Sequence, residues 1–220
     1  MKHLFVVAHP DDEVLGAGGF IHKAIKNKDE VLVIILNADY EKTRKEMFSD
    51  IEKSHKVLGI TEHSLYSYKN MSFWNENHRE IVETIEKEID RFQPDNIFTH
   101  FDGDIHTDHK IVSYLTQQAA RRWQREGYSS KINKPRALYF MEVLSSTNWG
   151  SVGFVPDTYE KISADDLEKK IESLEKYKNV VRPSPHPRSE ECIKSLAILR
   201  GSNIGYDYAE AFKTCWRGAI

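Results

Sequence analysis

Two short clusters of imidazole and carboxylate side chains stand out in the sequence. The first is HPDDE at residues 9–13, and the second is DIHTDH at residues 104–109. Histidine nitrogens and carboxylate oxygens are good zinc ligands, and a catalytic zinc keeps three protein ligands and one open position. A further carboxylate beside such a site can take a proton from water. The two clusters together predict metal-assisted hydrolysis.

The spacing within the clusters suggests roles but leaves one choice open. His9 and Asp12 are three residues apart and can reach one ion, and one histidine of the second cluster would complete the set. Spacing alone does not decide between His106 and His109. The histidine that remains can donate a hydrogen bond to an oxyanion. Asp11 is the candidate general base, and its simpler alternative is a helix cap.

Four more polar residues are candidates for supporting roles. Asp108 can hold the ring of the oxyanion histidine, fix its tautomer and favour its protonated form. Asp104 either orients a ligand histidine or ends a turn. Arg44 and Arg188 are candidate substrate contacts, because guanidinium groups offer fixed donors, although exposed arginines are common.

Both clusters follow apolar runs that we expect to be strands. Residues 3–8 and 31–37 are short and almost continuously apolar, which is typical of buried parallel strands. Weaker candidates of the same kind cover 64–68, 96–100 and 137–143. Helical patterns separate them, at about 14–27, 41–58, 77–92 and 108–126.

This alternation predicts an α/β fold, with a Rossmann-like, mostly parallel sheet flanked by helices on both faces. The carboxyl ends of the strands then lie along one edge, where such folds bind ligands. The tail contains helical patterns at about 164–178 and 189–200. We expect one domain over 1–220, with a core of about 1–145 and a C-terminal extension of about 146–220.

Composition narrows the class of protein. The net charge of -3 gives no electrostatic reason to expect binding to nucleic acid. No apolar stretch is long enough for membrane insertion, and the first residues do not form a signal-peptide pattern. The two cysteines, Cys192 and Cys215, lack metal-ligand spacing and fit a reduced compartment. We therefore expect a cytoplasmic location.

The two clusters and their flanking residues resemble a known family. AHPDDEVLGAGG at 8–19 and HTDH at 106–109 are similar to the paired motifs of the LmbE-like deacetylases, also called the PIG-L family. Neither motif would be specific alone. Further similarities extend the resemblance over nearly the whole chain: Arg44 and Glu46 with Leu58-Gly59, PHPRS at 185–189 and YAEAF at 208–212.

The resemblance implies a role for each residue of the metal site. His9, Asp12 and His109 match the zinc (Zn²⁺) ligands of the family, and Asp11 matches its general base. His106 matches the histidine that stabilises the oxyanion.

The resemblance also implies Asp108 as the partner of that oxyanion histidine, and a Rossmann-type fold. The expected substrate is an N-acetylglucosamine derivative, which a metal-dependent N-deacetylase would hydrolyse to release acetate. A homo-oligomer is an open alternative to a monomer. A site of this ligand type could also hold Fe²⁺, Co²⁺ or Mn²⁺.

Two other functions are compatible with these residues. One is a related zinc amidase that cuts a larger amide, which the released acid would distinguish from a deacetylase. The other is a non-catalytic sugar-binding module. The presence of both Asp11 and His106 argues against a pure binding module, since binding requires neither residue.

Overall fold

The structure is a computed structural model that describes residues 1–38, 44–69, 71–124 and 133–218. The side chains of residues 44 and 45 also lie outside the described part. Within these ranges, no helix is both long and apolar enough to cross a membrane.

Seven strands of the described residues form one sheet in the order β3-β2-β1-β4-β5-β7-β6. The first five strands along the chain pair in parallel, and β7 pairs antiparallel with both β5 and β6. The expected α/β fold with a mostly parallel sheet is therefore confirmed. The strands are β1 (Lys2–Val7), β2 (Glu30–Ile35), β3 (Glu62–Leu65), β4 (Asn96–His100), β5 (Ala137–Met141), β6 (Thr158–Lys161) and β7 (Ala209–Arg217).

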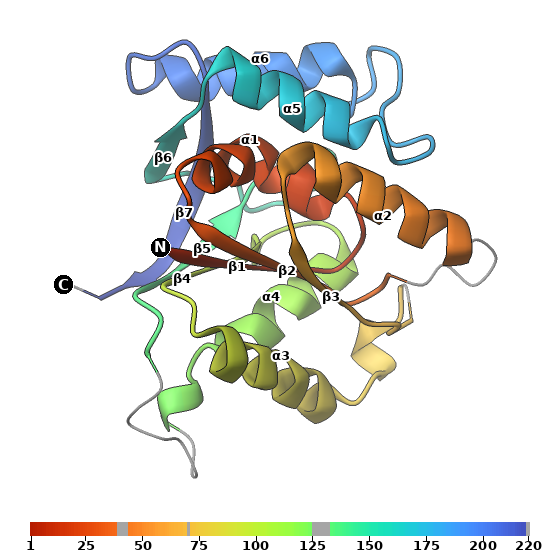
Figure 1. The fold of residues 1–220 in the computed structure, drawn as a ribbon, viewed down its shortest axis with the longest axis vertical. Helices are drawn as coiled ribbons and strands as arrows, with labels where there is room; N and C mark the ends of the chain where they lie inside the picture. Colours follow the sequence, from red (N-terminus) through yellow and green to blue (C-terminus); the bar gives the residue numbers. More distant parts are fainter. Residues whose placement is uncertain (39–43, 70, 125–132, 219–220) are drawn as a thin grey trace.

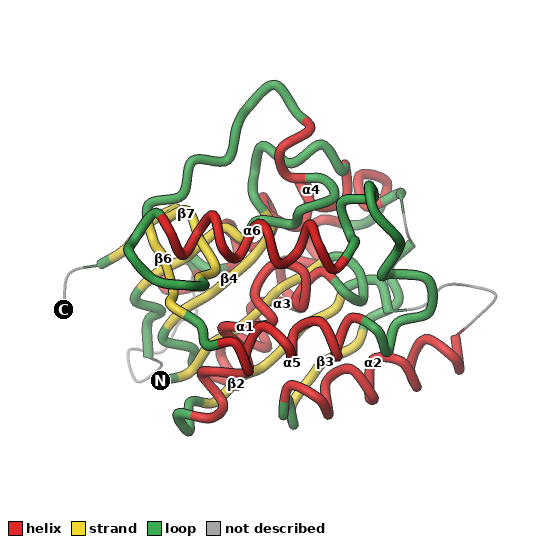
Figure 2. Tube along the Cα trace, turned by 90° about the horizontal axis from the view of Figure 1, so that it is seen from above, coloured by secondary structure: helices red, strands yellow, loops and turns green. Residues whose placement is uncertain are grey.

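Helices cover both faces of this sheet (Figure 1). Helices α3 and α4 pack on one face, and α1, α2, α5 and α6 lie on the other. Helix α5 packs against both α1 and α2 (Figure 2). The helices are α1 (Asp12–Lys26), α2 (Arg44–Leu58), α3 (His78–Phe92), α4 (Thr107–Ala119), α5 (Ala164–Leu174) and α6 (Glu190–Ser202), with 3-10 turns at Phe73–Asn75, Arg122–Gln124 and Thr147–Trp149.

The order of the strands places a crevice between β1 and β4. From β1 the chain moves to β2 and β3 on one side, and β4 and β5 then form on the other side. In open α/β sheets, ligands bind outside the carboxyl ends of the strands where the direction of winding reverses. The first cluster follows β1 and the second follows β4, so the fold brings both to this point.

The observed elements differ from the expected ones mainly in the extension. Strands β6 and β7 were not predicted, because neither TYEK nor AEAFKTCWR shows a clear alternation of apolar and polar residues. Strand β3 begins two residues earlier than expected, and α4 and α5 end several residues earlier. The expected helical residues 41–43 and 125–126 lie outside the described part.

A buried ion pair between Lys170 and Glu210, both in the extension, forms hydrogen bonds with the backbone of α1. Ala17 has non-helical torsion angles (φ -153, ψ 17) and interrupts this helix. The amides of Gly19 and Phe20 then donate to the carboxylate of Glu210 in β7, at 3.1 and 2.6 Å. Lys170 of α5 binds the same carboxylate at 2.6 Å and the carbonyl of Leu15 at 2.8 Å. Glu210 thus satisfies the backbone groups that the break in α1 leaves open.

We expect Glu210→Ala to lower the free energy of unfolding by about 3–5 kcal/mol, because it leaves the Lys170 ammonium buried without its carboxylate. Glu160→Ala is the matched control. Glu160 binds Lys23 at 2.9 Å, but both side chains are about one third exposed, so its loss should cost less than about 1 kcal/mol. Guanidinium unfolding measures both values, and equal losses would contradict the account.

Candidate metal centre

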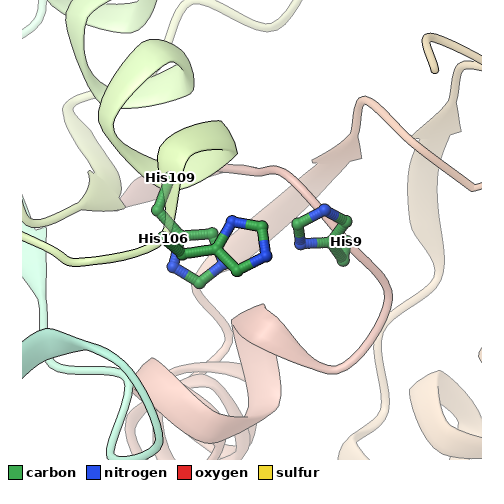
Figure 3. A group of neighbouring side chains, drawn as sticks. All are labelled: His9, His106 and His109. Atoms are coloured by element: carbon green, nitrogen blue, oxygen red, sulfur yellow. The ribbon is translucent and has the colours of Figure 1, made fainter. Parts of the chain in front are cut away.

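The two sequence clusters meet at the crevice between β1 and β4. His9, Asp11 and Asp12 lie on the turn from β1 into α1, and His106 and His109 lie at the start of α4. Figure 3 shows His9 facing the two histidines of α4. The ligand nitrogens of the three histidines lie within 4.8 Å of one another.

One carboxylate oxygen forms the centre of the cluster. Oδ2 of Asp12 lies 3.3 Å from Nδ1 of His9 and 3.3 Å from Nε2 of His109. Around a tetrahedral zinc ion with bonds of about 2.0–2.1 Å, neighbouring ligand atoms are about 3.3–3.4 Å apart. Both contacts of Asp12 have this length. The groups of three whose ligand atoms all lie within 4.8 Å of one another are His9 with His106 and His109, and Asp12 with His100 and His109.

Each of the two outer histidines also contacts a second carboxylate through its other ring nitrogen. Nε2 of His9 lies 3.1 Å from Asp108, and Nδ1 of His109 lies 3.3 Å from Asp104. Carboxylates in this position orient metal-binding histidines and increase their basicity. Asp104 thus lies where it can orient a ligand histidine.

The carboxylates of the cluster favour positive charge on its two outer histidines, His9 and His109. Burial alone would lower the pKa of His9, but its contacts with Asp108 and Asp12 raise it to about 10. Burial would also lower the pKa of His109, but Asp12 and Asp104 raise it to about 9. Without a metal, these carboxylates therefore draw protons onto both rings. A divalent metal would supply the same positive charge and displace the protons.

His106 differs from the other two histidines in its partners. The backbone amide of Asp108 donates to its Nδ1 at 3.2 Å, so the neutral ring carries its proton on Nε2. Burial, together with the positive charges of His109 and His9, lowers the pKa of His106 to about 4. We had expected the Asp108 carboxylate to hold this ring in its protonated form. That carboxylate instead faces His9, so His106 is a neutral donor.

Asp11 is buried beside the cluster, and it does not cap α1 with its side chain. Its backbone has a φ of 96, a conformation that is uncommon for residues other than glycine and often found at functional sites. Nη1 of Arg188 donates to its carboxylate at 3.0 Å, while Nε of Arg188 donates to Ser145. Burial raises the pKa of Asp11 to about 7, although Arg188 lowers it. A base with this pKa suits proton transfer near neutral pH.

His100 is an alternative ligand that the sequence analysis treated as structural. It is fully buried, and its ring stacks on that of His109 with 3.9 Å between the ring centroids. Its ligand atom lies within 4.8 Å of those of His109 and Asp12. However, its Nε2 accepts the backbone amide of Ala8 at 2.9 Å. That hydrogen bond occupies the lone pair of Nε2, which counts against His100 as a ligand in this arrangement.

A cleft of about 700 Å³ opens over the cluster. Arg188 lines it, as do Lys178 and Arg182 of the same C-terminal loop, and Asn37 at the end of β2. The side chain of Arg44, the other expected substrate contact, lies outside the described residues. The sequence analysis missed Asn37, although a polar residue at the end of an apolar run was a usable signal.

Tyr177 is a second missed residue of the cleft. Its hydroxyl donates to the fully buried carboxylate of Glu13 at 2.9 Å, and His55 of α2 contacts the same carboxylate at 3.2 Å. Glu13 therefore ties the start of α1 to α2 and to the C-terminal loop. Nothing in the local sequence around Tyr177 indicated this contact.

Solved structures share this fold at low sequence identity. A conserved protein, TT1542, from Thermus thermophilus is 22% identical with a TM-score of 0.82, covering 100% of this chain and 97% of that one. N,N'-diacetylchitobiose deacetylase from Pyrococcus horikoshii is 20% identical with a TM-score of 0.77, and the match covers 97% of this chain and 83% of that one. The 4-carboxy-2-hydroxymuconate hydratase GalB from Pseudomonas putida is 20% identical with a TM-score of 0.81, and the match covers 100% of this chain and 98% of that one.

These likenesses establish the fold alone, since the activities named for these proteins include both a deacetylase and a hydratase. No curated protein matches the sequence. A family model, described as GlcNAc-PI de-N-acetylase, matches residues 4–120, a range that includes both clusters and more than half of the chain. The chain therefore belongs to the PIG-L family.

Proposed function

We propose that this protein is a zinc-dependent hydrolase that removes the N-acetyl group from an N-acetylglucosamine-type amino sugar or its conjugate, releasing acetate. The observation that carries the proposal is the pair of 3.3 Å contacts that Asp12 makes with His9 and His109, with the buried carboxyl group of Asp11 beside them in one cleft. Membership of the PIG-L family and the likeness to a chitobiose deacetylase support it.

The metal and its ligands would activate the amide. His9, Asp12 and His109 would hold the ion, with Asp108 and Asp104 orienting the two rings. A zinc ion bound there supplies Lewis-acid chemistry, which polarises an amide carbonyl and makes water more acidic.

Asp11 would accept the proton of the attacking water at its carboxylate. Burial keeps its pKa near 7, so the same carboxyl group can later return the proton to the leaving nitrogen. Arg188 fixes the position of this carboxylate through a hydrogen bond of 3.0 Å. In this proposal Arg188 positions the base, which differs from the substrate contact that we expected from the sequence.

Nε2 of His106 would donate a hydrogen bond to the oxygen that becomes negatively charged when water adds to the carbonyl carbon. The tautomer that this requires is the one set by the Asp108 amide. Such donors stabilise the transition state by about 3–4 kcal/mol in known hydrolases. A larger amide would use the same groups, so the identity of the released acid separates a deacetylase from the related amidase.

We expect Asp11→Asn to lower kcat/KM for acetate release by about 10²–10⁴-fold, because it removes the base. The amide retains the shape of the side chain and an oxygen for Arg188, so bound zinc should be unchanged. Asp165→Asn, on an exposed side chain, is the control. Full turnover by a zinc-loaded Asp11→Asn protein would disprove the role.

Asp104→Ala and Asp108→Ala should each weaken zinc binding by about 10–100-fold, because each leaves one ligand histidine without its orienting carboxylate. Competition with a chromogenic chelator measures the affinity, and thermal unfolding of each variant checks that it folds. His78→Gln, at the start of α3, is the control. Unchanged affinity in both carboxylate variants would contradict the assigned ligands.

Arg188→Gln should shift the acidic limb of the kcat/KM profile to higher pH. The positive charge of Arg188 lowers the pKa of Asp11, so its loss raises that pKa and reduces the ionised base at neutral pH. The loss of activity should therefore be larger at pH 6 than at pH 9, which stopped assays across this range would measure. An equal loss at every pH would indicate a role in substrate binding alone.

A further inference from the structure

Asn37 stands at the carboxyl end of β2, beside the proposed metal centre. Its backbone amide donates to the carbonyl of Ala8 at 2.8 Å, and Ala8 directly precedes His9. The residue is 1% exposed to solvent and lines the same cleft as His9 and Asp11. Asn37 is therefore one strand away from the proposed ligands, on the side opposite His106.

The side chain of Asn37 is held in one orientation. Its Nδ2 donates to the carbonyl of Tyr68, and its backbone also forms a bridge with Ser67. With the amide nitrogen bound in this way, the carboxamide oxygen is the atom left to interact. This Oδ1 is buried and accepts no hydrogen bond from any residue in the described ranges.

A buried acceptor without a donor is costly, and native proteins pair the great majority of such atoms. An acceptor that belongs to a residue lining the cleft, and that is fixed before binding, can obtain its donor from a ligand that enters the cleft. Amino sugars offer hydroxyl groups as donors close to the acetamide. The position beside His9 suits a hydroxyl of the sugar ring whose acetamide lies at the metal centre.

We propose that Oδ1 of Asn37 accepts a hydrogen bond from a ring hydroxyl of the amino-sugar substrate and so selects substrates that carry this hydroxyl. The inference rests on the proposed function and adds a specificity-determining residue to it. A site built to bind a hydroxyl discriminates against analogues that lack it, because the buried acceptor then remains unpaired.

The test combines Asn37→Ala with removal of the matching substrate group. N-acetylglucosamine and its 3-, 4- and 6-deoxy analogues are titrated into zinc-loaded Asp11→Asn protein, in which loss of the base slows turnover, with and without Asn37→Ala. We expect one deoxy analogue to bind about 10–100-fold more weakly than N-acetylglucosamine. In the Asn37→Ala background, that analogue and N-acetylglucosamine should bind equally.

This cycle separates a substrate contact from a structural role. Loss of the Tyr68 contact would weaken all four sugars by one factor and leave their ratios unchanged, and this result would overturn the inference. Asn27→Ala, on an exposed residue at the end of α1, should change neither affinities nor ratios.

Acetate release by the wild-type protein is measured in parallel. Release together with unchanged ratios would overturn the role of Asn37 and leave the proposed deacetylase intact. If none of the four sugars binds, the Asn37 contact is overturned, whereas the deacetylase proposal fails only if no conjugate of N-acetylglucosamine releases acetate either. If the sugars bind with the expected ratios but no acetate forms, the Asn37 contact holds and the deacetylase proposal fails.

Discussion

Concentrated negative charge at the crevice between β1 and β4 constrains the rest of this structure. Asp12 contributes one oxygen that lies 3.3 Å from a nitrogen of His9 and of His109, and two further carboxylates stand behind those rings. Buried carboxylates next to imidazole rings favour positive charge on those rings. The pKa values of His9 and His109 are raised for this reason, so both rings hold protons when no metal is bound. The proposed divalent metal would supply the same positive charge.

Residues of the extension after about residue 146 contact α1 and the side chains around the candidate metal centre. Glu210 binds the amides that the break in α1 exposes, and α1 begins with the residues of the first cluster. Arg188 binds Asp11, the proposed general base, and Tyr177 binds Glu13. Because β6 and β7 join the same sheet as the core strands, these contacts are held by the framework that also positions the histidines.

Local patterns in the sequence predicted the parallel core and the two clusters, because apolar runs and helical periods are local signals. They could not predict which partner each carboxylate would take. The Asp108 carboxylate was assigned to His106, but the backbone amide of the same residue occupies that ring and the carboxylate reaches His9. Asn37 was likewise assigned only to a strand, since its unpaired oxygen depends on contacts with distant residues.

The central claim is that the cluster holds a metal that hydrolyses an N-acetylated amino sugar. The most direct test measures acetate and free amine released from a panel of N-acetylglucosamine derivatives by metal-stripped protein, with and without added zinc. We predict that release requires zinc and occurs with at least one derivative in the panel. Zinc shown to be bound, with no release from any derivative, would contradict the claim.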